Sequence, residues 1–179
     1  SISSARLLTS ISNLMISKSR RAYSGSTGRV AEVRFVRAAE EKGLQVTKSS
    51  RSEDMYKHVD YWLAMDDKGK WGVDVKGNNL PDEIWVELQN VGGNPGWLKG
   101  DASIIAFDMP EEGGFSVVNR VDLLEYVNQN VNTEVVRNKR DAYKKLYQRK
   151  DRQDLITILH LRDIRGLESY RVWKYFEDY

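Results

Sequence analysis

The sequence contains no cysteine, which excludes a disulfide framework, a thiolate metal site and a cysteine nucleophile. It has only two histidines, His58 and His160, and this scarcity argues against a zinc site built from histidine ligands. No apolar run approaches the roughly 18 residues that a membrane-spanning helix needs. We therefore expect no membrane partner and an intracellular location, in the cytoplasm or nucleoid.

The composition is that of an ordinary globular chain. Its 179 residues are 40% hydrophobic and 30% charged, which is typical of one soluble domain with extensions. A chain of this length can bury a sizeable core.

The net charge of +2 conceals a strong segregation of charge along the chain. Residues 1–31 carry five basic residues and no acid, and residues 53–90 carry nine acids against four lysines. Residues 135–152 carry eight basic residues against two acids. An acidic middle between basic segments suits a cation site framed by surfaces for a polyanion, although solvated surface of both signs has the same composition.

The N-terminal segment, residues 1–24, is rich in serine and basic residues. Apolar side chains recur at helical spacing at Leu7, Leu8, Ile11, Leu14 and Met15. This pattern predicts an amphipathic helix that packs on protein. The alternative is an organelle transit peptide, which would place the protein in an organelle matrix.

A run of alternating residues at 71–77 predicts a β-strand. Because side chains alternate across a strand, Asp74 and Lys76 share one face, and the apolar side chains lie on the other. The alternative is a surface ion pair on an edge strand, but the flanking apolar residues favour a central strand.

Two further runs predict strands with polar faces. Residues 58–63 bring Asp60 close to this strand, and residues 84–89 place Glu87 and Gln89 on a shared face. A lone acid among apolar residues, as at Asp60, needs a partner. Glu87 and Gln89 are candidates for a third metal ligand and a hydrogen-bonding support, or for capping of a sheet edge.

A helix is predicted from about residue 29 to residue 42, ending at Gly43. Glu32 lies on the same face as Phe35, and a carboxylate on an apolar face is costly unless it is paired or functional. The alternative is that Glu32 pairs with Arg29 or Arg34 on the helix surface.

Two carboxylates and a lysine on neighbouring strands are the groups that metal-assisted phosphodiester cleavage needs. Carboxylates hold a hard, oxygen-preferring cation. A lysine orients the attacking water or offsets the charge that builds on phosphate.

Along the chain, the helix with Glu32 is followed by the strands that carry Asp60, Asp74 and Glu87. This order of elements resembles the core of the PD-(D/E)XK nuclease superfamily, which includes restriction endonucleases and Holliday-junction resolvases. The resemblance covers about residues 28–107. Its pieces are the run from Gly28 to Glu32 where the loop enters the helix, the run from His58 to Asp60 in the strand at 58–63, and the run from Val73 to Gly77 in the next strand. The chain departs from the family in having Val59 where the proline before the first aspartate stands.

The resemblance implies an α/β fold with a restriction-endonuclease-like core and a central mixed sheet flanked by helices. The residue patterns outside it predict helical N- and C-terminal extensions. The resemblance also implies a Mg²⁺-dependent endonuclease for DNA, with Mn²⁺ able to substitute, working as a homodimer. The resemblance makes Asp60, Asp74, Lys76 and Glu32 catalytic, with Asp60 and Asp74 as metal ligands. The residue pattern adds Glu87 as the candidate third ligand.

A basic helix is predicted over residues 135–151. Basic side chains track phosphates, and interleaved tyrosines can stack on exposed bases, although a solvated helix is the plainer interpretation. The nucleic-acid-binding candidates are His58, Arg137, Lys139, Arg140, Tyr143, Lys144, Lys145, Tyr147 and Arg149.

These elements divide the chain into an N-terminal extension (1–24), a nuclease core (25–110) and a C-terminal extension carrying the basic helix (111–179). Residues 24–28 are expected to form a loop, 121–130 a helix and 155–161 a strand. Two other functions remain open: a catalytically silent DNA-binding module on the same fold, and an interaction protein anchored by its N-terminal helix.

Overall fold

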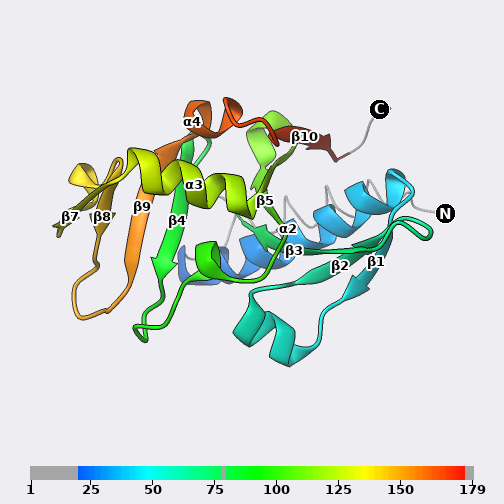
Figure 1. The fold of residues 1–179 in the computed structure, drawn as a ribbon, viewed down its shortest axis with the longest axis horizontal. Helices are drawn as coiled ribbons and strands as arrows, with labels where there is room; N and C mark the ends of the chain where they lie inside the picture. Colours follow the sequence, from blue (N-terminus) through cyan, green and yellow to red (C-terminus); the bar gives the residue numbers. More distant parts are fainter. Residues whose placement is uncertain (1–19, 78–79, 176–179) are drawn as a thin grey trace.

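The computed structural model describes residues 20–77 and 80–175, with side chains from residue 28 onward, and shows an α/β fold with two mixed sheets (Figure 1). Within these residues the first sheet has six strands in the order β1-β2-β3-β5-β6-β10. They are β1 (Gln45–Lys48), β2 (Tyr61–Ala64), β3 (Lys70–Lys76), β5 (Ile104–Met109), β6 (Gly114–Asn119) and β10 (Arg171–Lys174). The pair β3 and β5 is parallel, and the other pairs are antiparallel.

The second sheet has four strands in the described residues, in the order β4-β9-β8-β7. They are β4 (Glu83–Gln89), β7 (Asn132–Val136), β8 (Lys145–Tyr147) and β9 (Leu155–His160). The described helices are α2 (Arg20–Glu41), α3 (Arg120–Asn130) and α4 (Leu161–Arg165), and the short helical turns are η1 (Glu53–Lys57), η2 (Trp97–Lys99), η3 (Pro110–Glu112) and η4 (Lys139–Asp141). No described helix is long and apolar enough to cross a membrane.

Helix α2 covers one face of the first sheet. Ala31 and Phe35 lie one turn apart and are fully buried against Val73 and Val75 of β3. The predicted end of the helix is confirmed: α2 stops at Glu41, and Gly43 follows with a φ of +81°, a conformation that glycine adopts without a steric penalty.

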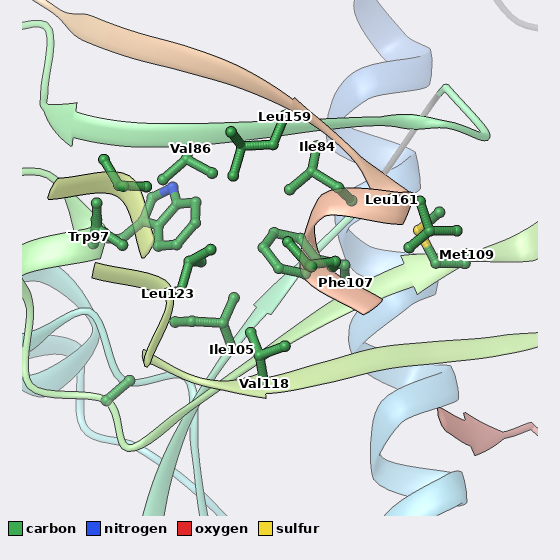
Figure 2. Packing of buried hydrophobic residues seen from close by; sticks show 14 of the residues in the cluster. Ile84, Val86, Trp97, Ile105, Phe107, Met109, Val118, Leu123, Leu159 and Leu161 are labelled. Atoms are coloured by element: carbon green, nitrogen blue, oxygen red, sulfur yellow. The ribbon is translucent and has the colours of Figure 1, made fainter. Parts of the chain in front are cut away.

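The main core lies between the two sheets (Figure 2). Ile84 and Val86 of β4 face Ile105 and Phe107 of β5, and Leu123 of α3 closes the cluster. All of these side chains are buried. Because a single sheet would leave this apolar surface in water, the second sheet is part of the same folded unit.

The expectation of one central sheet is wrong in one respect, because β4 leaves the first sheet and pairs with β9 in the second. Segments after residue 110 also take part in both sheets, since β6 and β10 extend the first and β9 pairs with β4. The predicted helical C-terminal extension is therefore largely strands. Local periodicity defines a strand but does not choose its sheet partner.

The predicted basic helix at residues 135–151 is also wrong. This segment contains the end of β7, the turn η4 and strand β8. The β-branched residues Thr133, Val135 and Val136 favour a strand, and Val136 is buried in a cluster with Ile158 of β9. Tertiary contacts here outweigh the helical spacing of the basic residues.

The loop predicted at residues 24–28 is wrong as well, because α2 runs through it from Arg20. Glycine and serine cost a helix only about 1 kcal/mol or less each, and the packed half of α2 after residue 30 offsets this. Of the predicted N-terminal amphipathic helix, residues 1–19 lie outside the described part of the chain. The predicted helix at 121–130 and strand at 155–161 are confirmed as α3 and β9.

Candidate active site

Asp60, the residue directly before β2, lies opposite Asp74 of β3, the strand that pairs with β2 in the antiparallel direction. The register of β2 and β3 pairs Tyr61 with Val73, and the Asp60 N–H donates to the Val73 carbonyl at 2.8 Å. One step further along this register places Asp60 opposite Asp74. Directly opposed side chains share a face and approach closely, so the two carboxyl groups come together.

The carboxyl group of Asp60 is held by the strand that carries its partner. The backbone N–H of Val75 donates to Asp60 Oδ2 at 2.7 Å. Burial, and then the nearby charge of Asp74, raise the pKa of Asp60 to about 8. Two carboxylates in one buried place cannot both ionise freely, so without a cation Asp60 keeps a proton near neutral pH.

Asp74 is almost completely buried, and burial raises its pKa although Lys76 opposes the shift. Lys76 Nζ lies 3.0 Å from Asp74 Oδ1. The second oxygen, Asp74 Oδ2, is buried and accepts no hydrogen bond from an N–H group or a hydroxyl of the described residues, and the neighbouring acid that can share a proton with the Asp74 carboxyl group is Asp60. A buried carboxylate oxygen without a donor is unfavourable unless something positive or protonated completes it. The predicted shared face of Asp74 and Lys76 is therefore confirmed, with Asp74 buried and Lys76 half-buried on the central strand β3.

The side chains of Glu32, Asp60, Asp74 and Lys76 converge on one pocket of about 240 Å³. Glu32 accepts a hydrogen bond from Lys48 Nζ at 3.1 Å. The complete lining is Gly28, Glu32, Lys48, Asp54, His58, Asp60, Asp74, Val75 and Lys76. Four residues that the sequence assigns to catalysis, from α2, strand β3 and the position directly before β2, thus share one pocket.

Two lining residues, Lys48 and Asp54, were not singled out in the sequence. Lys48 ends β1, an edge strand, and Asp54 lies in η1 after a short loop. Neither belongs to a spaced motif with the other acids. Only the pairing of β1 with β2 and the fold of the loop bring them to the pocket, so a sequence pattern offers no signal for them.

Four acids line this pocket, and of these Asp60 and Asp74 are the two that interact closely enough to share one metal ion. In residues 20–77 and 80–175, no three His, Cys, Asp or Glu side chains are arranged to hold one metal ion. The Asp60 and Asp74 pair nevertheless fits a cation, because it combines close carboxyl groups with the unpartnered Asp74 Oδ2. Mg²⁺ is commonly held by one or two carboxylates, with water and phosphate oxygens filling its other positions.

Glu87 and Gln89 do not line this pocket. They lie in β4 of the second sheet, where Ile84 and Val86 face the core, and alternation turns Glu87 to the other side. The Gln89 side chain donates to the Gln153 carbonyl at 2.6 Å. The structure therefore does not bring these two residues to the carboxylate pair.

The basic nucleic-acid candidates gather at the second sheet, away from the carboxylates. Lys139, Arg140 and Tyr143 line another pocket, of about 520 Å³, together with His160. His58 lines the carboxylate pocket instead.

Several of these candidates are tied to internal partners. Lys144 Nζ lies 3.5 Å from Asp163, and Lys145 Nζ lies 3.1 Å from Glu134. The other pairs are Lys139 with Glu83, Arg149 with Asp154, Arg137 with Gln148, Tyr143 with Asp163 and Tyr147 edge-on against Trp85. By contrast, the Arg140 side chain is 81% exposed, with Asp141 at 4.0 Å.

No family model matches the chain, and no curated protein or solved structure shows significant similarity to it. The geometry of the pocket therefore carries the functional argument.

Proposed function

We propose that this chain is a metal-dependent endonuclease that hydrolyses phosphodiester bonds in DNA. The observation that carries the proposal is the buried Asp74, which lies opposite Asp60, pairs through Oδ1 with Lys76, and has in Oδ2 an oxygen that accepts from no N–H group or hydroxyl of the described residues. The order of α2 with Glu32, then β1, β2 and β3, and a parallel β5, supports the resemblance to the PD-(D/E)XK nucleases.

Asp60 and Asp74 would hold Mg²⁺ or Mn²⁺, with the Val75 backbone carbonyl as a further oxygen donor. The bound cation would acidify a water molecule and offset negative charge on the phosphate. Asp60 must release its proton to serve as a ligand, and the raised pKa of this group makes cation binding stronger as the pH rises towards 8.

Lys76 and Glu32 act on the reacting atoms in this proposal. The Lys76 ammonium donates hydrogen bonds to the attacking water or to a phosphate oxygen, and it offsets charge in the transition state. The Glu32 carboxylate accepts a hydrogen bond from the water and orients it. Lys48, which pairs with Glu32, holds that carboxylate at the pocket wall.

Cleavage of a duplex or a four-way junction needs a cut on each strand. One chain contributes one such pocket in its described residues, so we propose that the working form is a homodimer.

The test is an assay on supercoiled, linear and four-way-junction DNA, with Mg²⁺ or with EDTA. Lys76→Ala should lower the rate by roughly 10²–10³, the usual effect of losing a preorganised charge contact. Lys70→Ala is the matched control, because Lys70 is an exposed lysine at the other end of β3.

The proposal requires cutting that EDTA abolishes and a clear difference between the two lysine variants. Mg²⁺-independent cutting, or equal rates for Lys76→Ala and the parent, would refute it. DNA binding without any cutting would favour the catalytically silent DNA-binding module.

A further inference from the structure

One helical turn borders the proposed active site. Asp54 in η1 and His58 directly after it line the carboxylate pocket. Between them, Met55 is 53% exposed and Tyr56 is 76% exposed. Among the exposed large hydrophobic side chains of the described residues, Tyr56 has the largest exposed fraction. An apolar surface of this kind at the rim of a polar pocket is a candidate contact for a bound molecule.

The turn is firmly held, so the exposure does not come from a loosely attached loop. The Ser50 N–H donates to the Glu53 carboxylate at 2.9 Å, and the Glu53 N–H donates to Ser50 Oγ at 3.1 Å. The Trp62 indole donates to the other Glu53 oxygen at 3.1 Å. At the far end, the Asp101 N–H donates to the Lys57 carbonyl at 2.9 Å. Both ends of η1 are therefore anchored to neighbouring segments.

The backbone of the turn is unusual. It is a single π-helical turn, a form that occurs often at functional sites. His58 ends it with a φ of 54°, in the left-handed region that side chains with a Cβ disfavour. A Cβ on Gly100 would lie only 3.0 Å from the His58 Cβ, so the adjacent loop packs closely on this residue. The surrounding structure thus holds the turn in a conformation that it would not favour alone.

The acidic and basic side chains of this segment lie in different surroundings. Glu53 is engaged by Ser50 and Trp62, and Asp54 lines the pocket. Arg51 and Lys57, which precede and follow Tyr56 in the sequence, are both exposed. An aromatic side chain between exposed cations matches a nucleic-acid strand, because the cations attract phosphates and the ring stacks on a base.

We propose that Tyr56, with Met55 beside it, stacks on an unpaired base of the strand that enters the carboxylate pocket. This inference rests on the proposed function, since it takes the pocket as the site of cleavage. A base in an intact duplex is already stacked and leaves no free face for Tyr56. The substrate class is therefore nucleic acid with unpaired nucleotides beside the cut, as in a single strand, an overhang or a branch point.

The test measures binding apart from cleavage. Fluorescence anisotropy in EDTA compares a labelled single strand with a blunt duplex of the same length. Tyr56→Ala should weaken single-strand binding by roughly 5- to 150-fold, the effect of losing one base–aromatic stack, and leave duplex binding unchanged. Tyr56→Phe should keep the parent affinity, because the ring remains. Val121→Ser, at an exposed position on α3, is the control for loss of a surface apolar group.

Equal single-strand affinity for Tyr56→Ala and the parent overturns the inference, as does an equal loss for Tyr56→Phe. A change in light-scattering mass on Tyr56→Ala would identify the patch as a self-association surface and also overturn it. If Tyr56 governs single-strand binding but Mg²⁺ produces no cutting, the inference stands and the nuclease proposal fails. If Lys76-dependent cutting occurs and Tyr56→Ala binds normally, only the inference fails.

Discussion

The backbone N–H of Val75 donates to the Asp60 carboxyl group at 2.7 Å, so the strand that carries Asp74 also orients Asp60. The two acids are fixed relative to one another by a main-chain contact rather than by flexible side chains. A metal or substrate that needs both groups meets them preorganised, which is the arrangement that electrostatic catalysis uses.

The raised pKa of Asp60 predicts a pH-dependent stability. Its pKa rises from 3.8 to about 8 on folding, through burial and then Asp74, so the folded state keeps a proton that the unfolded chain releases between these values. The contribution of this group to the free energy of unfolding therefore falls as the pH rises from 4 to 8. Asp60→Asn cannot ionise and should gain melting temperature relative to the parent over that interval.

Melting curves without divalent cations, at acidic and at mildly alkaline pH, check this. For a domain of this size, each kcal/mol of unfolding free energy changes the melting temperature by about 2–4 °C. The increase in melting temperature from Asp60→Asn should be several times about 2–4 °C larger at alkaline pH than at acidic pH. Asp67→Asn, in an exposed turn, should change the melting temperature equally at both pH values. A gain that is the same at both pH values would contradict the raised pKa.

Cation binding should depend on Asp60 and Asp74 at the first sheet and not on Glu87 of the second sheet. Calorimetry with Mg²⁺ or Mn²⁺ should show binding that Asp74→Asn weakens sharply, because Asp74 supplies the unpartnered oxygen. Glu87→Gln should bind as the parent does, since Glu87 does not line the pocket. The reverse result, loss with Glu87→Gln alone, would place the cation at the second sheet.

The basic segment at residues 135–152 should contribute unequally to DNA binding. Arg140→Ala should reduce the slope of log K against log salt by about 0.9 if Arg140 contacts one duplex phosphate. Lys145→Ala should change it less, because Lys145 is paired with Glu134. Anisotropy titrations at several salt concentrations measure both, with Lys68→Ala in an exposed turn as control. Unchanged slopes for Arg140→Ala would show that DNA does not reach this surface.

The packing of α2 on the first sheet depends on Phe35, which is fully buried and stacks on Trp173 at 5.8 Å and edge-on to Phe115 at 5.5 Å. Phe35→Ala should lower the free energy of unfolding by about 3–5 kcal/mol, the usual range for deleting a buried aromatic ring. Urea unfolding followed by circular dichroism measures the loss. The exposed Val33→Ala on the same helix should cost far less, and equal losses would mean that α2 is not packed as described.

Local patterns in the sequence were sufficient for many elements. Alternation predicted the strand that carries Asp74 and Lys76, and the apolar spacing with Gly43 predicted the packed part and the end of α2. These features depend on the chain's own periodicity and backbone preferences, which act over a few residues. The shared face of Asp74 and Lys76 follows from the same rule.

What the sequence determined by itself was thus the strand and helix segments and the residue types that could do phosphodiester chemistry. Only the tertiary structure decided which of them meet. It brought Lys48 and Asp54 to the pocket, placed Glu87 in the second sheet, and gave the helically spaced basic run a short turn, a short strand and loop in place of a helix. The physical reason is that sheet partners and segment conformation depend on burial shared between distant parts of the chain, as at Val136 and Ile158, and no local pattern contains that information.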